Sequence, residues 1–193
     1  LPFGKILKSK WGILLVLLPA LLFVVFLQYI PAVSSGQQLL QSINWIPSLG
    51  VNLDFRLDGL SMLFSLLITG IGIAIFFYAR SYLKNDVYLD RFFGYLCLFM
   101  SAMLGIVLSD NILLLFVFWE LTSISSFFLI GFNNNELASR KSAITALSVT
   151  GMGGFFLLAG LILLGNISGT YTISELIHSR NLIIHHPQYP LVL

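Results

Sequence analysis

Charged side chains are scarce in this sequence. Only 9% of its 193 residues are Asp, Glu, Lys or Arg, whereas a soluble domain carries about 25%. Hydrophobic residues make up 58%, and the mean hydropathy of +0.94 is more than a single core can shield from water. The composition therefore excludes a soluble globular protein and predicts a chain that uses a lipid bilayer as part of its solvent.

Other shortages exclude further classes. The net charge is only +2 and the basic residues are scattered, so no basic run could follow a nucleic-acid backbone. Cys97 is the single cysteine, which excludes a disulfide framework and a cysteine-based metal site. His178, His185 and His186 lack a metal-binding spacing, and no catalytic triad or nucleotide motif is present. We expect no resident metal or cofactor and no chemistry on covalent bonds.

Five apolar stretches are long enough, or nearly so, to cross a bilayer as helices, which takes about 20 residues. They cover residues 11–30, 60–78, 92–108, 111–130 and 143–164. Pro31 follows the first stretch and three asparagines follow the fourth, as is typical of helix ends. The first stretch resembles a signal peptide, but it lacks a small-residue cleavage site, which favours a retained helix. We predict an all-α polytopic membrane protein with a five-helix membrane domain over residues 11–164.

The flanking segments indicate an orientation. Eight of the ten Lys and Arg residues fall on one side of the five spans, and only Arg56 and Arg180 fall on the other. Cytoplasmic loops are enriched in Lys and Arg, so residues 1–10 are predicted to be cytoplasmic and residues 165–188 to form a non-cytoplasmic loop. Residues 189–193 have the composition of the start of a further helix, which indicates a piece of a longer polytopic protein.

Glu120 is the single charged side chain inside the five predicted spans. It lies about 15 Å along the fourth span, at the bilayer midplane, where a charge costs roughly 2.5 to 3.5 kcal/mol. Three interpretations arise: a protonated carboxyl that only joins helices, a misplaced span, or a proton-binding or cation-binding group on a transport path. The apolar neighbours Phe118 and Trp119 disfavour the second, and we favour the third. Since no cationic side chain lies within the spans, the partner of Glu120 is expected on another part of the protein or another subunit.

Several weaker candidates accompany Glu120. Ser123 is three residues further along and shares its helix face, so its hydroxyl or a held water could extend a hydrogen-bonded path. Asp58 and Asp110 stand where helices begin, which favours N-caps, with a part in ion access as the alternative. The four-residue repeat of Ser61, Ser65 and Thr69 in the second span indicates close helix packing.

Three segments of the sequence resemble a known family. They read RLDGLSMLFSLLITGIG (residues 56–72), LFMSAMLGIVLSDNILLLFVFWELTSISSFFLIGF (residues 98–132) and VTGMGGFFLLAGLILLG (residues 149–165). All three resemble the large A-type subunit of bacterial Mrp-type Na⁺/H⁺ antiporters, which is related to the antiporter-like proton-channel subunits of respiratory complex I. The most specific part is SDN followed by FWELTS, which contains Glu120.

The resemblance implies a polytopic subunit of a hetero-oligomeric complex in the bacterial cytoplasmic membrane. It implies that Glu120 is the membrane acid of the proton path and that its lysine partner belongs to later helices. The complex I relatives tend to carry an arginine and an aspartate where this chain has Gly151 and Gly154, so the uncharged version is more similar to the Mrp branch.

We therefore expect a subunit of a monovalent cation/proton antiporter, which exports Na⁺ in exchange for H⁺ through Glu120. The transported ions are its only expected ligands, and its expected partners are other subunits and lipid. One alternative is the proton-pumping membrane subunit of an NADH:quinone oxidoreductase. The other is a structural membrane subunit in which Glu120 only joins helices.

Overall fold

The structure, a computed structural model, describes residues 12–46, 51–83, 88–187 and 189–192, so the predicted cytoplasmic segment 1–10 lies outside the described residues. Five long apolar helices dominate it, each long enough to cross a membrane. They are α2 (Gly12–Ser34), α3 (Gly59–Tyr82), α4 (Leu89–Leu108), α5 (Ile112–Ile130) and α6 (Leu137–Ser168). The predicted all-α polytopic fold is confirmed.

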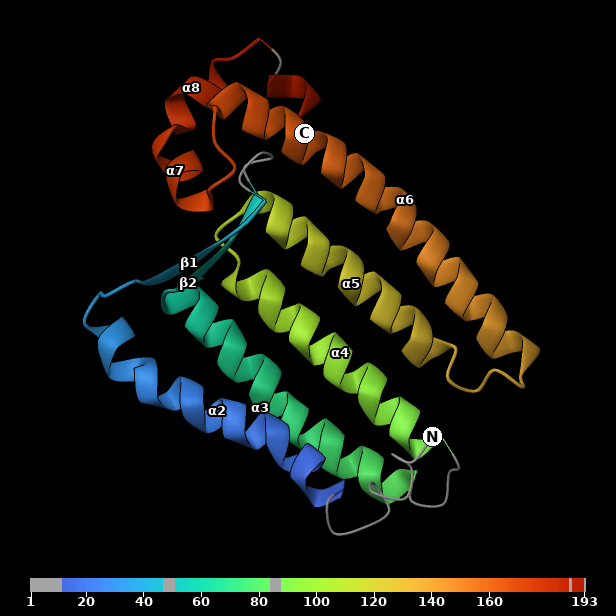
Figure 1. Cartoon of the computed structure of the whole chain (residues 1–193). Helices are drawn as coiled ribbons and strands as arrows, with labels where there is room; N and C mark the ends of the chain where they lie inside the picture. Colours follow the sequence, from blue (N-terminus) through green and yellow to red (C-terminus); the bar gives the residue numbers. More distant parts are fainter. Residues whose placement is uncertain (1–11, 47–50, 84–87, 188, 193) are drawn as a thin grey trace.

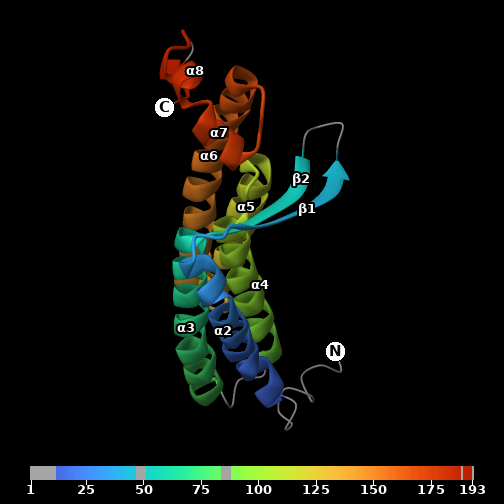
Figure 2. The ribbon, with the colours of Figure 1, turned by 90° about the vertical axis from the view of Figure 1, so that its left-hand side faces the viewer.

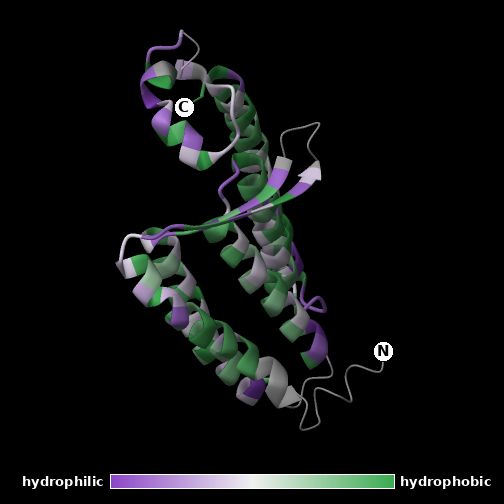
Figure 3. Cartoon of the chain, turned by 60° about the vertical axis from the view of Figure 1, so that its left-hand side comes forward, coloured by the Kyte–Doolittle hydropathy of each residue, from purple (hydrophilic) through white to green (hydrophobic). Residues whose placement is uncertain are grey.

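The five helices lie side by side in chain order, each in contact with the next (Figure 1). Seen from the side, they form a narrow layer from which the β-strands project to one side (Figure 2). Hydrophobic residues cover the helices along most of their length (Figure 3). Large apolar side chains such as Phe155 and Phe156 of α6 are 76% and 70% exposed, as expected of a surface that faces lipid or further helices.

Small residues bring α2, α3 and α4 close together. Gly72 of α3 leaves room for Pro19 of α2 and Met100 of α4, since a Cβ at position 72 would lie 3.4 Å and 3.3 Å from their nearest atoms. Ser65 and Thr69 of the same stripe are fully buried, and the Thr69 hydroxyl donates to the Ser65 carbonyl at 2.6 Å. The small-residue stripe of the second span therefore packs against neighbouring helices, as its spacing predicts.

Two strands precede α3 and were not foreseen in the sequence. β1 (Leu39–Ile46) and β2 (Val51–Leu57) form an antiparallel pair in which Leu39 lies opposite Leu57, with an irregularity between Asn44 and Ile46. Leu53, Phe55 and Leu57 alternate with polar residues along β2, which is the period of a strand. We call the end of the helix layer that carries these strands the hairpin edge.

Backbone hydrogen bonds join three distant segments at the hairpin edge. The N–H of Asp110, between α4 and α5, donates to the carbonyl of Asp54 in β2 at 2.7 Å. The N–H of Ile173 donates in turn to the carbonyl of Asp110, also at 2.7 Å. The hairpin, the α4–α5 connection and the segment after α6 are thus held as neighbouring extended chains.

The helix ends differ from those expected. α2 continues past Pro31 to Ser34, because a proline in the last turn removes one backbone donor without ending the helix. α6 begins at Leu137 rather than at residue 143, so Arg140 and Lys141 belong to its first turns. It ends at Ser168, and the next residue, Gly169, caps it with a φ of 74°, a conformation that favours glycine.

The segment after α6 is more ordered than the loop expected there. It contains the short helices α7 (Ile173–His178) and α8 (Arg180–Ile184), followed by a 3₁₀ turn at Tyr189–Leu191. Ile167, Leu176 and Ile183 bury their side chains together with Ile112 at the start of α5. This small core fixes α7 against the hairpin edge. That residues 189–193 begin a further membrane helix stays a prediction.

Candidate functional site

Glu120 is the ninth of the nineteen residues of α5, so about 12 Å of helix separates it from the first residue. The other charged residues of the five long helices lie within five residues of a helix end: Arg80, Asp90, Arg91, Arg140 and Lys141. Glu120 is therefore the one charged group that the described helices hold deep within the apolar layer.

The carboxyl group of Glu120 lies against the backbone of α6 at Gly154. A Cβ built at position 154 would overlap Oε1 of Glu120 and would lie 3.1 Å from its Cδ. Gly154 is buried, whereas a Cβ at Gly151 or Gly153 of the same helix meets nothing within 4 Å. Of these three glycines, Gly154 alone provides space for the carboxyl group.

The Oε1 atom of Glu120 is buried and has no hydrogen-bond partner among the described residues. A buried polar atom without a partner is destabilising by about 1 to 3 kcal/mol, and by more if it carries charge. A donor or a cation that satisfies this atom must therefore come from a mobile ion, water or another part of the protein.

A groove of about 450 Å³ runs between α5 and α6, and its lining includes the chain neighbours Trp119 and Gly153 but neither Glu120 nor Gly154. Trp119, Ser123 and Thr150 are among the residues that line it. Ser123 is 7% exposed, and its hydroxyl donates back to the carbonyl of Trp119 at 3.4 Å rather than to Glu120. Ser125 and Thr122 bond to their own helix in the same way, at 2.7 Å each. Ser123 faces the groove, but no hydrogen bond joins it to Glu120.

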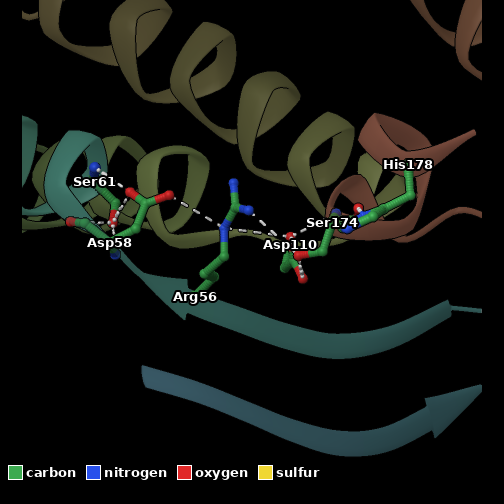
Figure 4. Close-up of polar contacts among 6 residues, drawn as sticks. All are labelled: Arg56, Asp58, Ser61, Asp110, Ser174 and His178. Atoms are coloured by element: carbon green, nitrogen blue, oxygen red, sulfur yellow. Dashed lines mark hydrogen bonds and ion pairs between the residues drawn. The ribbon is translucent and has the colours of Figure 1, made fainter. Parts of the chain in front are cut away.

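A second cluster of charge lies at the hairpin edge, where Arg56 of β2 stands between Asp58 and Asp110 (Figure 4). Its Nε is 3.4 Å from Oδ2 of Asp58 and 3.5 Å from Oδ1 of Asp110. Its Nη1 donates to the hydroxyl of Ser174 in α7 at 3.3 Å, and that hydroxyl donates to Oδ2 of Asp110 at 2.6 Å. The guanidinium therefore ties the hairpin, α3, the α4–α5 connection and α7 together.

Asp58 caps α3, as its position in the sequence predicts. Its Oδ1 accepts a hydrogen bond from the N–H of Ser61 at 2.9 Å, and its own N–H donates to the Ser61 hydroxyl at 2.7 Å. Burial raises the pKa of Asp58, but the hydrogen bonds from Ser61 and the charge of Arg56 outweigh it, so the pKa lies below its usual 3.8. Asp58 is thus held in its charged form.

The prediction that Asp110 caps α5 is wrong. Asn111 is the N-cap, and its side-chain oxygen accepts from the N–H groups of Leu113 and Leu114 at 3.0 Å and 3.3 Å. The backbone of Asp110 instead pairs with β2 and with Ile173, which turns its 4% exposed side chain toward Arg56 and Ser174. An Asp-Asn pair before a helix offers two possible caps, and long-range strand pairing decides between them.

Sequence reasoning missed Arg56 and Ser174 as partners of these acids. In the sequence Arg56 was interpreted only as a charge in a loop, and its contacts with both acids emerge from the fold. No signal in the sequence placed Ser174 beside Asp110, because 64 residues separate them. His178, a weak metal-ligand candidate in the sequence, donates a hydrogen bond from Nδ1 to the Ser174 carbonyl at 2.7 Å. The described residues contain no group of three metal-ligating side chains.

Two family models match the chain. The one described as NADH-ubiquinone oxidoreductase (complex I), chain 5 N-terminus, covers residues 43–93. The one described as NADH:quinone oxidoreductase/Mrp antiporter, TM, covers residues 109–189, which include Glu120 and Gly154. The chain thus belongs to the antiporter-like membrane subunits shared by these two kinds of complex.

Within that family, the resemblance to the large A-type subunit of the Mrp-type antiporters is confirmed. The chain is 44% identical over 187 residues to the A1 subunit of a Na⁺/H⁺ antiporter of Staphylococcus haemolyticus, a match that covers 97% of this chain and 23% of that protein. The chain therefore spans about a quarter of the length of this relative.

Solved structures of related membrane complexes contain chains with a similar fold. The Mrp complex from Dietzia sp. DQ12-45-1b contains a chain that is 30% identical, with a TM-score of 0.73 over 90% of this chain and 19% of that chain. The membrane-bound sulfane sulfur reductase, an archaeal respiratory membrane complex, matches with a TM-score of 0.77 at 21% identity, over 98% of this chain and 39% of that chain. The second match shows a shared fold.

Proposed function

We propose that this chain is part of a monovalent cation/proton antiporter subunit that exports Na⁺ in exchange for H⁺, with Glu120 as the ion-binding group. The observation that carries the proposal is the buried, unpartnered Oε1 of Glu120 in the middle of α5. The name of the staphylococcal relative supports the exchange of these two ions. The proposed partners are the other subunits of a hetero-oligomeric complex in the bacterial cytoplasmic membrane.

The chemistry follows from the burial of Oε1 of Glu120 in the middle of an apolar helix. A protonated Glu120 is neutral and is stable in an apolar layer, whereas the carboxylate is costly there unless a cation lies beside it. Loss of the proton and arrival of a cation are therefore coupled at this atom. Each charge that crosses a 100 mV potential is worth about 2.3 kcal/mol, so an exchange of unequal charge is driven by the membrane potential.

The groove between α5 and α6 is the proposed approach to Glu120. It holds the Ser123 hydroxyl and is large enough for water, which Glu120 needs for proton transfer. Asp58 and Asp110 already share Arg56, and these contacts support a role in holding the hairpin edge together. Ion access through Asp58 and Asp110 would require Arg56 to move.

The proposed orientation puts the hairpin edge outside the cell. The opposite edge carries Arg80, Arg91, Arg140 and Lys141, in agreement with the enrichment of basic residues on cytoplasmic sides. Arg56 and Arg180 lie on the hairpin side of the layer. In this orientation α5 runs from the outside inward.

Replacement of Glu120 by Gln in the whole complex tests the proposal. Na⁺-dependent proton flux in membrane vesicles should be abolished while the complex still assembles, because the amide keeps the shape and cannot release a proton. Glu136→Gln is the matched control, since this exposed glutamate precedes α6 and makes no side-chain cap. Unchanged flux in the Glu120 variant would favour a purely structural subunit.

The redox-linked alternative, a proton-pumping subunit of an NADH:quinone oxidoreductase, differs from the antiporter in the source of energy that drives proton movement. The first family model is named after an NADH-oxidising complex, and this name is the reason for testing the alternative. Exchange that runs on an imposed ion gradient, with a respiratory inhibitor present, supports the antiporter. Proton movement that requires NADH oxidation supports the alternative.

A further inference from the structure

The edge opposite the hairpin contains a cavity of about 410 Å³ between α4, α5 and α6. Arg91 of α4 and Arg140 of α6 line it, together with Asn134 of the α5–α6 connection. Tyr95, Phe128 and Ile144 also line it. We propose that this cavity binds the phosphodiester headgroup of an anionic phospholipid. The proposal does not depend on the transport function.

The two arginines supply the charge. Both are exposed, and neither takes part in the ion pairs recorded among the described residues. The guanidinium of Arg91 lies 4.9 Å from the centre of the Tyr88 ring, which holds it at the mouth of the cavity. Planar guanidinium groups bind phosphate oxygens through two parallel hydrogen bonds, and here two arginines from different helices line one cavity.

No described carboxylate lines this cavity. Asp90 and Glu136 lie on the same edge, but neither is among the lining residues. The field inside the cavity is therefore positive, which favours a phosphate over an ammonium or a neutral headgroup.

The apolar lining distinguishes a lipid from a free phosphate ion. Tyr95 follows Arg91 by four residues on α4, and Ile144 follows Arg140 by four residues on α6, so both lie about 6 Å deeper in the layer. The Tyr95 ring stacks on Phe128 of α5 at 4.8 Å and 12°. Charge at the mouth and rings further in match a phosphate followed by the first atoms of acyl chains, and basic pockets between membrane helices recognise such headgroups.

The test counts phospholipids retained by the purified whole complex in native mass spectrometry. The variant is Arg91→Gln with Arg140→Gln, and the control is Arg80→Gln with Lys141→Gln, which removes two charges from the same edge outside the cavity. Phosphatidylglycerol affinity should fall about fivefold for each cavity arginine and about 25-fold for both. The control should retain the lipid.

Other outcomes overturn the proposal. Equal retention of phosphatidylglycerol by both double variants would show that the cavity does not hold the lipid. Equal retention of phosphatidylcholine by the wild-type complex would exclude recognition of an anionic headgroup, and displacement of the lipid by millimolar inorganic phosphate would indicate a free anion site. Loss of a neighbouring subunit without loss of lipid would assign the arginines to an acidic protein partner.

A second measurement tests the proposal even if the double glutamine variant does not assemble. Delipidated wild-type complex should gain thermal stability from phosphatidylglycerol and not from phosphatidylcholine, and Arg91→Lys with Arg140→Lys should reduce that gain because lysine lacks the planar fork. No gain from phosphatidylglycerol contradicts the proposal.

Discussion

Replacement of Gly154 by Ala probes the contact between α6 and Glu120. The new methyl group would overlap Oε1 of Glu120, so either the helices separate or the carboxyl leaves its buried position. Overpacking of this kind costs about 1 to 3 kcal/mol, which lowers the occupancy of the buried position about 5- to 150-fold. Because the carboxyl is proposed to bind the transported ion, Na⁺-dependent proton flux should fall over the same range.

Gly151→Ala is the matched control, because Gly151 does not line the groove between α5 and α6. It adds the same methyl group to the same helix and gains the same helix propensity, but meets nothing within 4 Å. Glu120→Asp draws the carboxyl back by one methylene, so Gly154→Ala should do less harm in that background. The assay is flux in vesicles that contain equal amounts of assembled complex. Equal flux in the Gly154 and Gly151 variants would refute the placement of the carboxyl or its role.

Two further predictions concern the hairpin edge. Arg56→Gln leaves the buried Asp110 without its cation and should lower the free energy of unfolding by about 1.5 to 3 kcal/mol. Thermal unfolding of the complex measures this loss. An unchanged midpoint of unfolding would contradict a stabilising role of the contact between Arg56 and Asp110. Asp58→Asn keeps an N-cap but removes the charge whose pKa is lowered. A carboxyl whose pKa is lowered by folding stabilises the folded state at pH values above its usual pKa of 3.8. It loses this contribution as the pH falls through the lower pKa of the folded state. The stabilities of wild type and variant should therefore differ at neutral pH and converge at pH values below about 3.8. A difference that persists in acid would contradict this origin.

The five membrane helices could be predicted from the sequence because their length and hydropathy are local properties. Glu120 stood out for the same reason, since a charge among nineteen residues of an apolar helix is visible without a structure. The end of α2 was less predictable, because Pro31 falls in a last turn where its missing donor does little harm.

The hairpin was missed although its signal was present. The alternation of Leu53, Phe55 and Leu57 with polar residues has the period of a strand, but it occupies a short segment between two strong helical signals. The role of Asp110 could not be predicted, because it depends on strand pairing with Asp54 and on Ser174, both distant in the sequence.

Gly154 shows which part of the candidate site could not be predicted from the sequence. The sequence has three glycines in this part of α6, at positions 151, 153 and 154, and only the packing of α5 on α6 shows that Gly154 meets Glu120. Neighbours in space from different helices are not encoded in either helix alone.

The most direct measurement is the infrared signal of the Glu120 carboxyl in the whole complex. A protonated carboxyl has a C=O stretch that its carboxylate lacks, so a difference spectrum recorded on addition of Na⁺ reports loss of the proton. The account predicts that this band decreases with Na⁺ and is absent in the Glu120→Gln variant. A band that persists unchanged in Na⁺, or that survives the substitution, would contradict proton exchange at Glu120.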